Sequence, residues 1–344
     1  MRTDPYHDEA DRRPCVKTES RWLLKIRGFA FLLVIAAATQ SSAAPLLEEA
    51  SGLLRIGDFL AIVSDKEPGR YYLAPVPATT PGPASIDPAR VRTIEWPAAS
   101  VGLDLEGIAQ LADGRVVLLS ERLRSLLDDR GIVAEYDNPL SEFGNRGLEG
   151  VAVRPLAGGA SRVAVLWEGG YPEFQAVPPQ LQNLNGRRPL QPQIWCHTLA
   201  AGTSRIRVKL DSAGAVDLER IELKPPLPEG PEPIAQRFRA TDLVWHRLSP
   251  TADDAWGFIV LLNSGNSPTA GPPVYEHQWL QKFSRSGDPV GPPIDLNQLV
   301  PDSLRHANWE GLAWLKEGSH LVLVHDVPPS GTPSLLIVTL PDGW

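Results

Sequence analysis

The stretch that decides the fold is "DLEGIAQLADGRVVLLSER", residues 104–122, which joins two short apolar runs through a turn. Both runs are rich in Val, Ile and Leu, and such runs bounded by turn residues are typical of β-strands. The turn contains a glycine, which tolerates the positive φ that tight turns need. The first run opens with the acidic residue Glu106, and the second run ends with the acidic residue Glu121.

Related phrases recur along the chain, as "GLEGVAVRPLAGGASRVAVLWEGG" at 147–170 and "NWEGLAWLKEGSHLVLVHD" at 308–326. The acidic openings of these units are Glu106, Glu149, Asp242 and Glu310. The corresponding second runs end in Glu121, Glu168, Asn263 and Asp326. Four-stranded units repeated in this way predict an all-β protein with a β-propeller fold. Two packed β-sandwiches are the alternative.

The spacing of the openings predicts six blades of about 50 residues each. One unit precedes the first clear copy, at 51–96, and a degenerate unit is placed near "QIWCHTL" at 193–199. Five blades remain open, because the unit near 193 rests on spacing alone. The C-terminal run "LLIVTL", 335–340, is expected to pair with strands of the first unit and to close the ring.

The N-terminal segment has the composition of a secretory signal peptide. Basic residues at Arg21, Lys25 and Arg27 precede the apolar run "GFAFLLVIAAA" at 28–38, and "SSAAP" follows with small residues. The apolar run is shorter than the roughly 20 residues that span a bilayer. We therefore predict an extension and signal peptide over 1–44, cleaved near Ala44. A single propeller domain over 45–344 follows, periplasmic or secreted and without a stable membrane span. An uncleaved signal anchor is the alternative.

The net charge and the cysteine content limit which binding partners and cross-links the chain can have. The chain carries a net charge of −8, and its first 44 residues hold seven basic and five acidic side chains, so the remainder carries −10. An acidic protein is a poor partner for nucleic acid, whose phosphates bind Lys and Arg. Cys196 is the only cysteine after residue 44, which excludes an internal disulfide in that part. The expected partner is a small-molecule substrate or a cell-envelope ligand.

Familiar enzyme motifs are missing from the sequence. It contains no G-x-S-x-G, no G-x-G-x-x-G, no phosphate-binding P-loop and no H-E-x-x-H. The sequence therefore gives no indication of an α/β-hydrolase serine, of a dinucleotide-binding fold or of a zinc protease.

The acidic openings predict a metal site. In a propeller the innermost strand of each blade lines the channel, so residues at the strand starts converge at one mouth. Crowded carboxylates must protonate or share a cation, and Ca²⁺ prefers oxygen ligands. We predict the ligands Glu106, Glu149, Asp242 and Glu310, with Glu106 and Glu149 as the catalytic candidates. Alternatively, each acid accepts hydrogen bonds from the backbone of a neighbouring blade.

Further candidates lie next to these positions. Asp104 precedes Glu106 by two residues and shares its face of the strand. Arginines in the same phrases could contact an anionic substrate, and a histidine beside an acid could act as a base, although solvated arginines and a structural histidine are the alternatives. The additional rim candidates are Asp104, Glu168, Asp326, Arg122, Arg146 and His325.

Four phrases together resemble the phytase-like family, also named the "esterase-like activity of phytase" domain, over roughly residues 50–343. They are "FLAIVSDKEPGRYYL" (59–73), "DLEGIAQLADGRVVLLSER" (104–122), "NRGLEGVAVRP" (145–155) and "NWEGLAWLKEGSHLVLVHD" (308–326).

The resemblance implies an exported propeller that hydrolyses a phosphate or other ester with the help of a metal. It carries over Asp104, Glu106, Glu149, Glu168 and Glu310 as site residues. The unit of Asp242, "ATDLVWHRL", departs from the family pattern because it lacks a Glu-Gly pair. The alternative function is a non-catalytic periplasmic propeller that binds an envelope ligand or protein.

Overall fold

The computed structural model describes residues 49–67, 69–96, 103–137, 147–169, 191–209, 218–226, 238–249, 251, 255–266, 274–326 and 334–344. The chain divides into two units, Met1–Gln40 and Ser41–Trp344, and every described residue belongs to the second. The predicted signal peptide therefore lies outside the described residues and stays a prediction. Within the described ranges, no helix has the length and apolarity needed to cross a bilayer.

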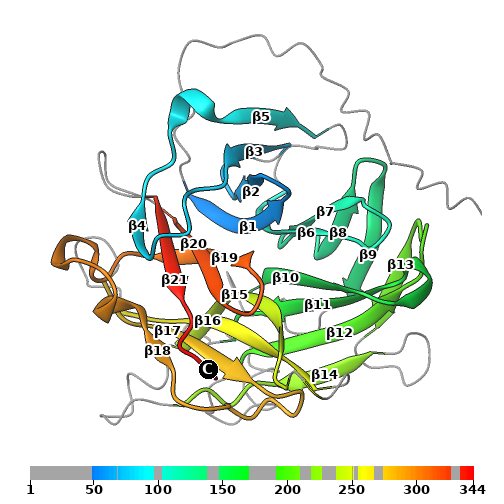
Figure 1. Cartoon of the computed structure of the whole chain (residues 1–344). Helices are drawn as coiled ribbons and strands as arrows, with labels where there is room; N and C mark the ends of the chain where they lie inside the picture. The colour runs from blue at the N-terminus through cyan, green and yellow to red at the C-terminus, as the bar shows by residue number, and fades with distance from the viewer. Residues whose placement is uncertain are drawn as a thin grey trace, which may run out of the picture. The chain divides into compact units, whose positions relative to one another are not determined.

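The described strands form five sheets (Figure 1). The first contains β1 (Ala50–Ile56), β2 (Phe59–Ser64), β3 (Arg70–Pro75) and β5 (Arg92–Glu95). The second contains β6 (Leu105–Gln110), β7 (Val116–Ser120), β8 (Ser125–Asp128), β9 (Gly131–Asp137) and β13 (Ile206–Lys209). The third contains β10 (Leu148–Pro155), β11 (Ser161–Trp167), β12 (Gln193–Leu199) and β14 (Glu219–Glu222).

The fourth sheet contains β15 (Phe238–Arg247), β16 (Trp256–Asn266), β17 (Val274–Phe283) and β18 (Ile294–Asp295). The fifth contains β19 (Trp309–Lys316), β20 (His320–His325), β21 (Leu335–Thr339) and β4 (Gly82–Ala84). The described helices are short 3₁₀ turns, η1 (Pro88–Arg90), η2 (Ala157–Gly159), η4 (Leu296–Gln298) and η5 (Asp302–Leu304).

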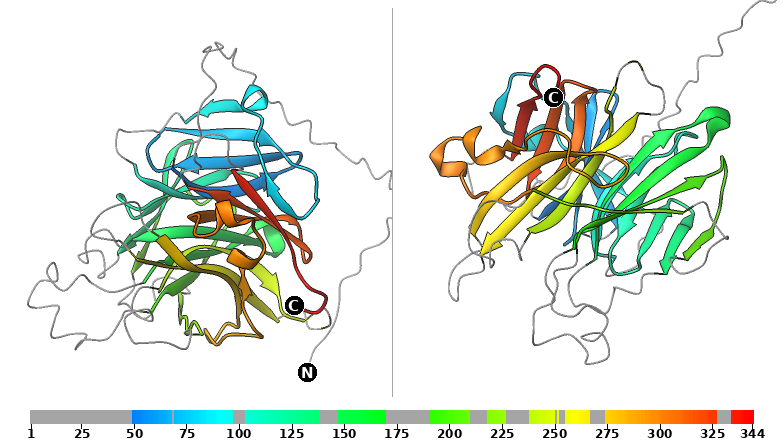
Figure 2. Two further views of the ribbon diagram at one scale, coloured as in Figure 1. Left: turned by 90° about the vertical axis from the view of Figure 1, so that its left-hand side faces the viewer. Right: turned by 90° about the horizontal axis from the view of Figure 1, so that it is seen from below.

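The first strands of the five sheets form a closed ring. β1 contacts β6, β6 contacts β10, β10 contacts β15, β15 contacts β19, and β19 returns to β1. In Figure 1 these strands lie near the centre, and β5, β13, β14 and β18 lie at the periphery. Figure 2 shows the same sheets from two further directions, with β16 in yellow beside the green strands of the third sheet. The predicted β-propeller is confirmed, and it has five blades.

The expectation of six blades is wrong, and the open alternative of five is correct. The expected extra unit at 193–199 is β12, which pairs along its whole length with β11 as the third strand of the third blade. The long connection over 168–192 separates these two strands in the sequence, so the spacing suggested a separate unit.

The ring closes as expected through its two ends. β21, near the C-terminus, pairs with β20 and also with β4, where Leu335 lies opposite Ala84. β4 comes from the connection between β3 and β5 of the first blade. The outermost strand of the last blade is thus supplied by the N-terminal part of the domain, and β21 has a partner on both edges.

The core lies between neighbouring blades. Alternate residues of a strand point to opposite faces of its sheet, and on β11 Val163 and Val165 face the second blade while Ala164 and Leu166 face the fourth. This explains why the strands are continuous apolar runs, since both faces of each sheet are covered. A fully buried Val or Leu contributes about 1.5–3 kcal/mol, so the interfaces between blades can hold the ring together without a disulfide.

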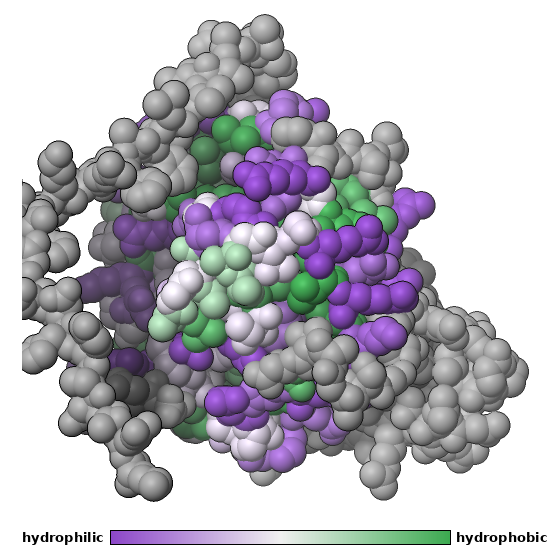
Figure 3. All heavy atoms as spheres, turned by 90° about the vertical axis from the view of Figure 1, so that its right-hand side faces the viewer, coloured by the Kyte–Doolittle hydropathy of each residue, from purple (hydrophilic) through white to green (hydrophobic). Residues whose placement is uncertain are grey.

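One outer strand crosses from one blade to another. β13 follows β12 of the third blade but pairs in parallel with β9 of the second. On this strand Val208 is buried, whereas Arg207 and Lys209 are exposed. Figure 3 looks onto the side of Figure 1 where β9 and β13 lie, and hydrophilic residues (purple) are interspersed there among hydrophobic ones. Charged side chains on an outer strand oppose pairing with another chain.

Candidate functional site

Each of the five inner strands carries a β-bulge near its start. The pairing register shifts between Ala50 and Gly52, Leu105 and Gly107, Leu148 and Gly150, Ala240 and Asp242, and Trp309 and Leu312. A bulge leaves an extra residue unpaired and re-aims its side chain. The residues at this bulge position are Ser51, Glu106, Glu149, Thr241 and Glu310.

The glycine after the bulge position allows the inner strands to approach one another. A Cβ at Gly52 would lie 2.7 Å from the Cα of Gly107 on the next blade. A Cβ at Gly311 would lie 2.9 Å from the backbone of Gly52, across the closure of the ring. Both distances are shorter than atoms tolerate, so a side chain would push the strands apart. The repeated Glu-Gly pair therefore combines an acid aimed at the mouth with a glycine that lets the ring close.

Asp242 occupies the glycine position of the fourth blade, and Thr241 occupies the bulge position. The carboxylate of Asp242 accepts hydrogen bonds from the backbone N–H groups of Leu243 (2.7 Å) and Leu312 (2.5 Å), and so ties β15 to β19. Burial raises the pKa of Asp242 well above its usual range. Asp242 does not line the pocket described below. The expectation that Asp242 is the equivalent of Glu106 was therefore off by one residue, because Thr241 occupies that position.

Two further positions of each blade meet at the same mouth, because antiparallel pairing brings the start of one strand beside the end of the next. Two residues before the bulge position stand Glu49, Asp104, Gly147, Arg239 and Asn308. At the end of the second strand, or beside it in the register, stand Asp65, Glu121, Glu168, Asn263 and Asp326. In every blade except the fourth, the backbone N–H of the residue at the end of the second strand donates a hydrogen bond to the backbone carbonyl of the residue two positions before the bulge. The N···O distances are 2.9–3.3 Å.

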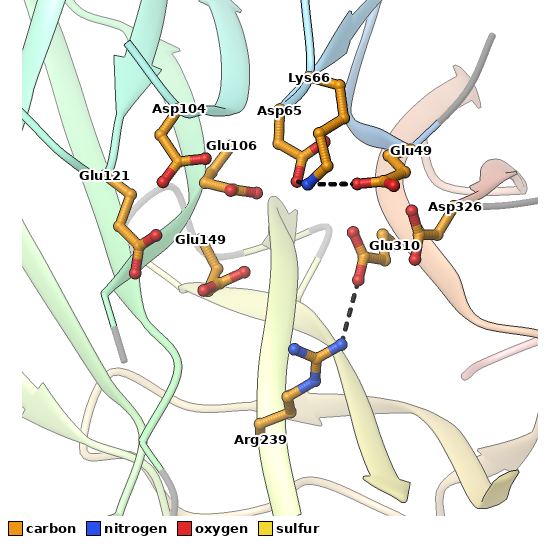
Figure 4. Close-up of a pocket in the computed structure, with 10 residues that line it drawn as sticks. All are labelled: Glu49, Asp65, Lys66, Asp104, Glu106, Glu121, Glu149, Arg239, Glu310 and Asp326. Atoms are coloured by element: carbon orange, nitrogen blue, oxygen red, sulfur yellow. Dashed lines mark hydrogen bonds and ion pairs between the residues drawn. The ribbon is translucent and has the colours of Figure 1, made fainter. Parts of the chain in front are cut away.

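These positions surround a pocket of about 240 Å³ (Figure 4). Its lining residues are Glu49, Asp65, Lys66, Asp104, Glu106, Glu121, Glu149, Arg239, Glu310 and Asp326. The structure thus brings together five of the sequence-predicted site residues, namely Asp104, Glu106, Glu149, Glu310 and Asp326. It adds five that were not predicted as site residues, namely Glu49, Asp65, Lys66, Glu121 and Arg239.

The other sequence candidates lie elsewhere. Glu168 is buried beside the pocket, accepts a hydrogen bond from the N–H of Gly147 at 3.2 Å and lies 3.8 Å from Arg239. His325 is buried with its ring edge-on to Trp309 at 5.3 Å, and burial lowers its pKa to about 4. Neither His325 nor the exposed Arg122 lines the pocket.

Arg146 lies outside the described residues. It therefore stays a prediction.

Burial and mutual repulsion raise the pKa values of several pocket acids, among them Glu106, Glu149 and Glu310. The pKa of Glu106 is well above its usual range through burial, and then through the charges of Glu310 and Glu121. Burial likewise raises the pKa of Glu149, and the nearby carboxylate of Glu168 raises it further. Burial raises the pKa of Glu310 to about 7, although Arg239 opposes this. At neutral pH the pocket therefore retains protons on some of its carboxyls or recruits a cation.

Two basic side chains reach the pocket (Figure 4). Lys66 forms ion pairs with Glu49 and, at 2.9 Å, with Asp65. Arg239 forms an ion pair with Glu310 at 3.1 Å. These two charges stand against eight lining carboxyls, so they leave a strongly negative site.

Two groups of acids have the spacing of a cation site. In each of the groups Asp65–Asp104–Glu106 and Glu121–Glu149–Glu168, one oxygen per residue lies within 4.8 Å of the others. Ca²⁺ binds oxygens at 2.3–2.6 Å, so two ligands on opposite sides of the ion stand about 4.6–5.2 Å apart. Each group joins side chains of neighbouring blades and offers only oxygen ligands. The residues present therefore fit a hard divalent cation.

Comparison with known proteins assigns no family. No family model matches the chain, and no curated protein matches it. The resemblance to the phytase-like family therefore stays a prediction.

Three solved structures with a similar arrangement are distant from this chain in sequence. A streptogramin B lyase is 9% identical, with 86% of this chain and 84% of that chain covered and a TM-score of 0.35. An endo-arabinase from Bacteroides thetaiotaomicron is 13% identical, with coverages of 87% and 95% and a TM-score of 0.40. A gluconolactonase from Xanthomonas campestris is 11% identical, with coverages of 86% and 88% and a TM-score of 0.31.

Proposed function

We propose that the chain is an exported, Ca²⁺-dependent hydrolase that acts on a phosphate or other ester at the acidic pocket. The observation that carries this proposal is the convergence of eight carboxyls, from four blades, on one pocket to which the described residues add two basic side chains. Such a concentration of buried and half-buried acids is costly unless a cation offsets it. Export rests on the signal-peptide pattern of the sequence, and the cellular site follows as periplasmic or secreted.

The two acid groups with cation spacing share one task in the pocket. Glu106 and Glu149 each belong to one group with cation spacing, and we assign them to holding the ion. When bound, Ca²⁺ polarises an ester or phosphoryl oxygen and favours deprotonation of a water.

Glu310 belongs to neither group, and its Oε1 accepts a hydrogen bond from Asn308 at 2.7 Å. With a pKa of about 7, it is the carboxylate best suited to take a proton from an attacking water.

The charge of the pocket restricts the substrate. Eight acids and two bases leave a negative potential that one or two divalent cations reduce but do not reverse. A densely charged inositol phosphate is therefore repelled. An ester with one anionic group, or with none, suits the pocket better.

The proposal is tested with purified protein on p-nitrophenyl phosphate, p-nitrophenyl acetate and lactones, with and without Ca²⁺. We expect turnover that needs Ca²⁺ and that falls at least about 100-fold in Glu149→Gln, as for loss of a group essential to the transition state. The matched control is Glu317→Gln, because Glu317 is exposed in the turn between β19 and β20. Inactivity on every substrate, with Ca²⁺ bound, would favour the non-catalytic binding propeller.

A further inference from the structure

The fourth blade differs from the other four at the pocket. Its three rim positions hold Arg239, Thr241 and Asn263, none of which is acidic. Among the lining residues, Arg239 is the one contributed by this blade, and the carboxyls all come from the others. Among the described residues, the mouth therefore joins acids from four blades to one guanidinium from the fourth blade.

Arg239 is anchored through one of its nitrogens. Nη2 donates to Oε1 of Glu310 at 3.1 Å and to the hydroxyl of Tyr275 at 3.5 Å. Nη1 lies 3.8 Å from Oε2 of Glu168, which is an ion pair beyond hydrogen-bond length. Among the described residues, neither Nη1 nor Nε donates a hydrogen bond. Figure 4 shows the guanidinium pointing into the pocket between Glu149 and Glu310.

We infer that Arg239 binds a single oxyanion of the substrate, a phosphate or a carboxylate, through Nη1. This inference rests on the proposed function, because a cation must first reduce the charge of the acids around the site. The planar guanidinium matches the geometry of an oxyanion and stays charged at every working pH. Glu168 lies 3.8 Å from Nη1 and belongs to a group with cation spacing, so a cation held by that group would lie near an oxyanion bound at Nη1.

This assignment replaces Arg122, one of the two arginines expected from the sequence. Arg122 is exposed and does not line the pocket. The assignment of Arg239 also defines the substrate further. Among the described lining residues Arg239 is the one guanidinium, and its Nη1 and Nε donate no hydrogen bond to them, whereas Lys66 is paired with Glu49 and Asp65. The substrate therefore carries one anionic group at Arg239, and the remainder of the molecule is uncharged.

Calorimetry on the purified protein tests the inference in two steps. The first titration uses Ca²⁺ alone, and the second adds phenylphosphonate, which has one oxyanion and no ester to hydrolyse. We expect phenylphosphonate to bind only after Ca²⁺. We also expect binding about 10- to 100-fold weaker in Arg239→Lys, because a charged hydrogen bond and the planar fork are lost. Benzoate distinguishes a carboxylate from a phosphate site, and benzyl alcohol, which has no charge, is expected not to bind.

A second pair of variants tests the role of Arg239 without leaving a buried charge unpaired. Arg239→Gln alone would leave Glu310 buried without its partner, so the double variant Arg239→Gln/Glu310→Gln is compared with Glu310→Gln. We expect the double variant to bind phenylphosphonate at least about 10-fold more weakly than the single variant. Arg130→Gln, at a largely exposed turn, is the control and binds normally.

The possible results separate the two proposals. Ca²⁺ binding with unchanged phenylphosphonate affinity in Arg239→Lys and in the double variant overturns the inference and leaves the cation site standing. A loss of affinity in Arg122→Gln without a loss in the Arg239 variants overturns it as well. Failure of Ca²⁺ to bind at all overturns both the inference and the proposed function.

Discussion

Replacing Asp242 by alanine separates a structural acid from a cation ligand. Its carboxylate accepts the backbone N–H groups of Leu243 and Leu312, and it is buried. An unsatisfied buried donor costs about 1–3 kcal/mol, so leaving both donors unsatisfied costs about 2–6 kcal/mol. A domain of about 300 residues has an unfolding entropy of about 0.6 kcal/mol/K. The melting temperature of Asp242→Ala should therefore fall by about 3–10 °C.

The assay combines thermal melting with Ca²⁺ titration of the same preparation. We expect the Ca²⁺ affinity of Asp242→Ala to stay within about twofold of the parent at a temperature where the variant is folded. Asp242→Asn keeps one acceptor oxygen and should lose about half as much stability. If Asp242→Ala melts like the parent but no longer binds Ca²⁺, Asp242 is a ligand and the assignment of Thr241 to the bulge position is wrong.

Three further outcomes are expected. Without Ca²⁺ the melting temperature should fall as the pH rises from about 5 to about 7.5, between the unfolded and folded pKa values of Glu310. The raised pKa of Glu310, about 7, gives stability that is present below its unfolded value near 4.5 and is lost as the pH rises through 7, up to about 3 kcal/mol; a flat profile contradicts this. Gly52→Ala should destabilise the domain by about 1–3 kcal/mol in urea unfolding, because the new Cβ meets the Cα of Gly107; an unchanged midpoint would show that the ring can expand. N-terminal sequencing of exported protein should begin near Ala44, and a start at Met1 would contradict the signal peptide.

The sequence was sufficient for the fold because each strand is an apolar run bounded by turn residues. The three Glu-Gly phrases mark the inner strands β6, β10 and β19. Blade number was harder, since it depends on which segments share a sheet. β12 is distant from β11 in the sequence, and β4 joins the last blade from the first part of the chain. Neither pairing leaves a local signal.

The site was only partly predictable for a related reason. Glu106, Glu149 and Glu310 were found because each stands before a glycine that the closed ring requires. In the fourth blade no glycine marks the position, and a bulge of one residue moves the alignment from Thr241 to Asp242.

Two of the missed pocket residues illustrate which signals were available. Glu121 was visible as the end of a second strand, and the recurrence of acids at these ends was a usable signal. Arg239 breaks the acidic pattern, so only the folded chain shows that it enters the pocket.

Ca²⁺ titration by isothermal calorimetry tests the central claim most directly, namely that acids from several blades bind Ca²⁺ at one pocket. We expect the parent protein to bind Ca²⁺ with a defined stoichiometry. The double variant Glu106→Gln/Glu149→Gln, which removes one acid from each group, should lose binding while it still unfolds in one cooperative thermal transition. Absence of binding in the parent, or unchanged binding in the double variant, would contradict the account.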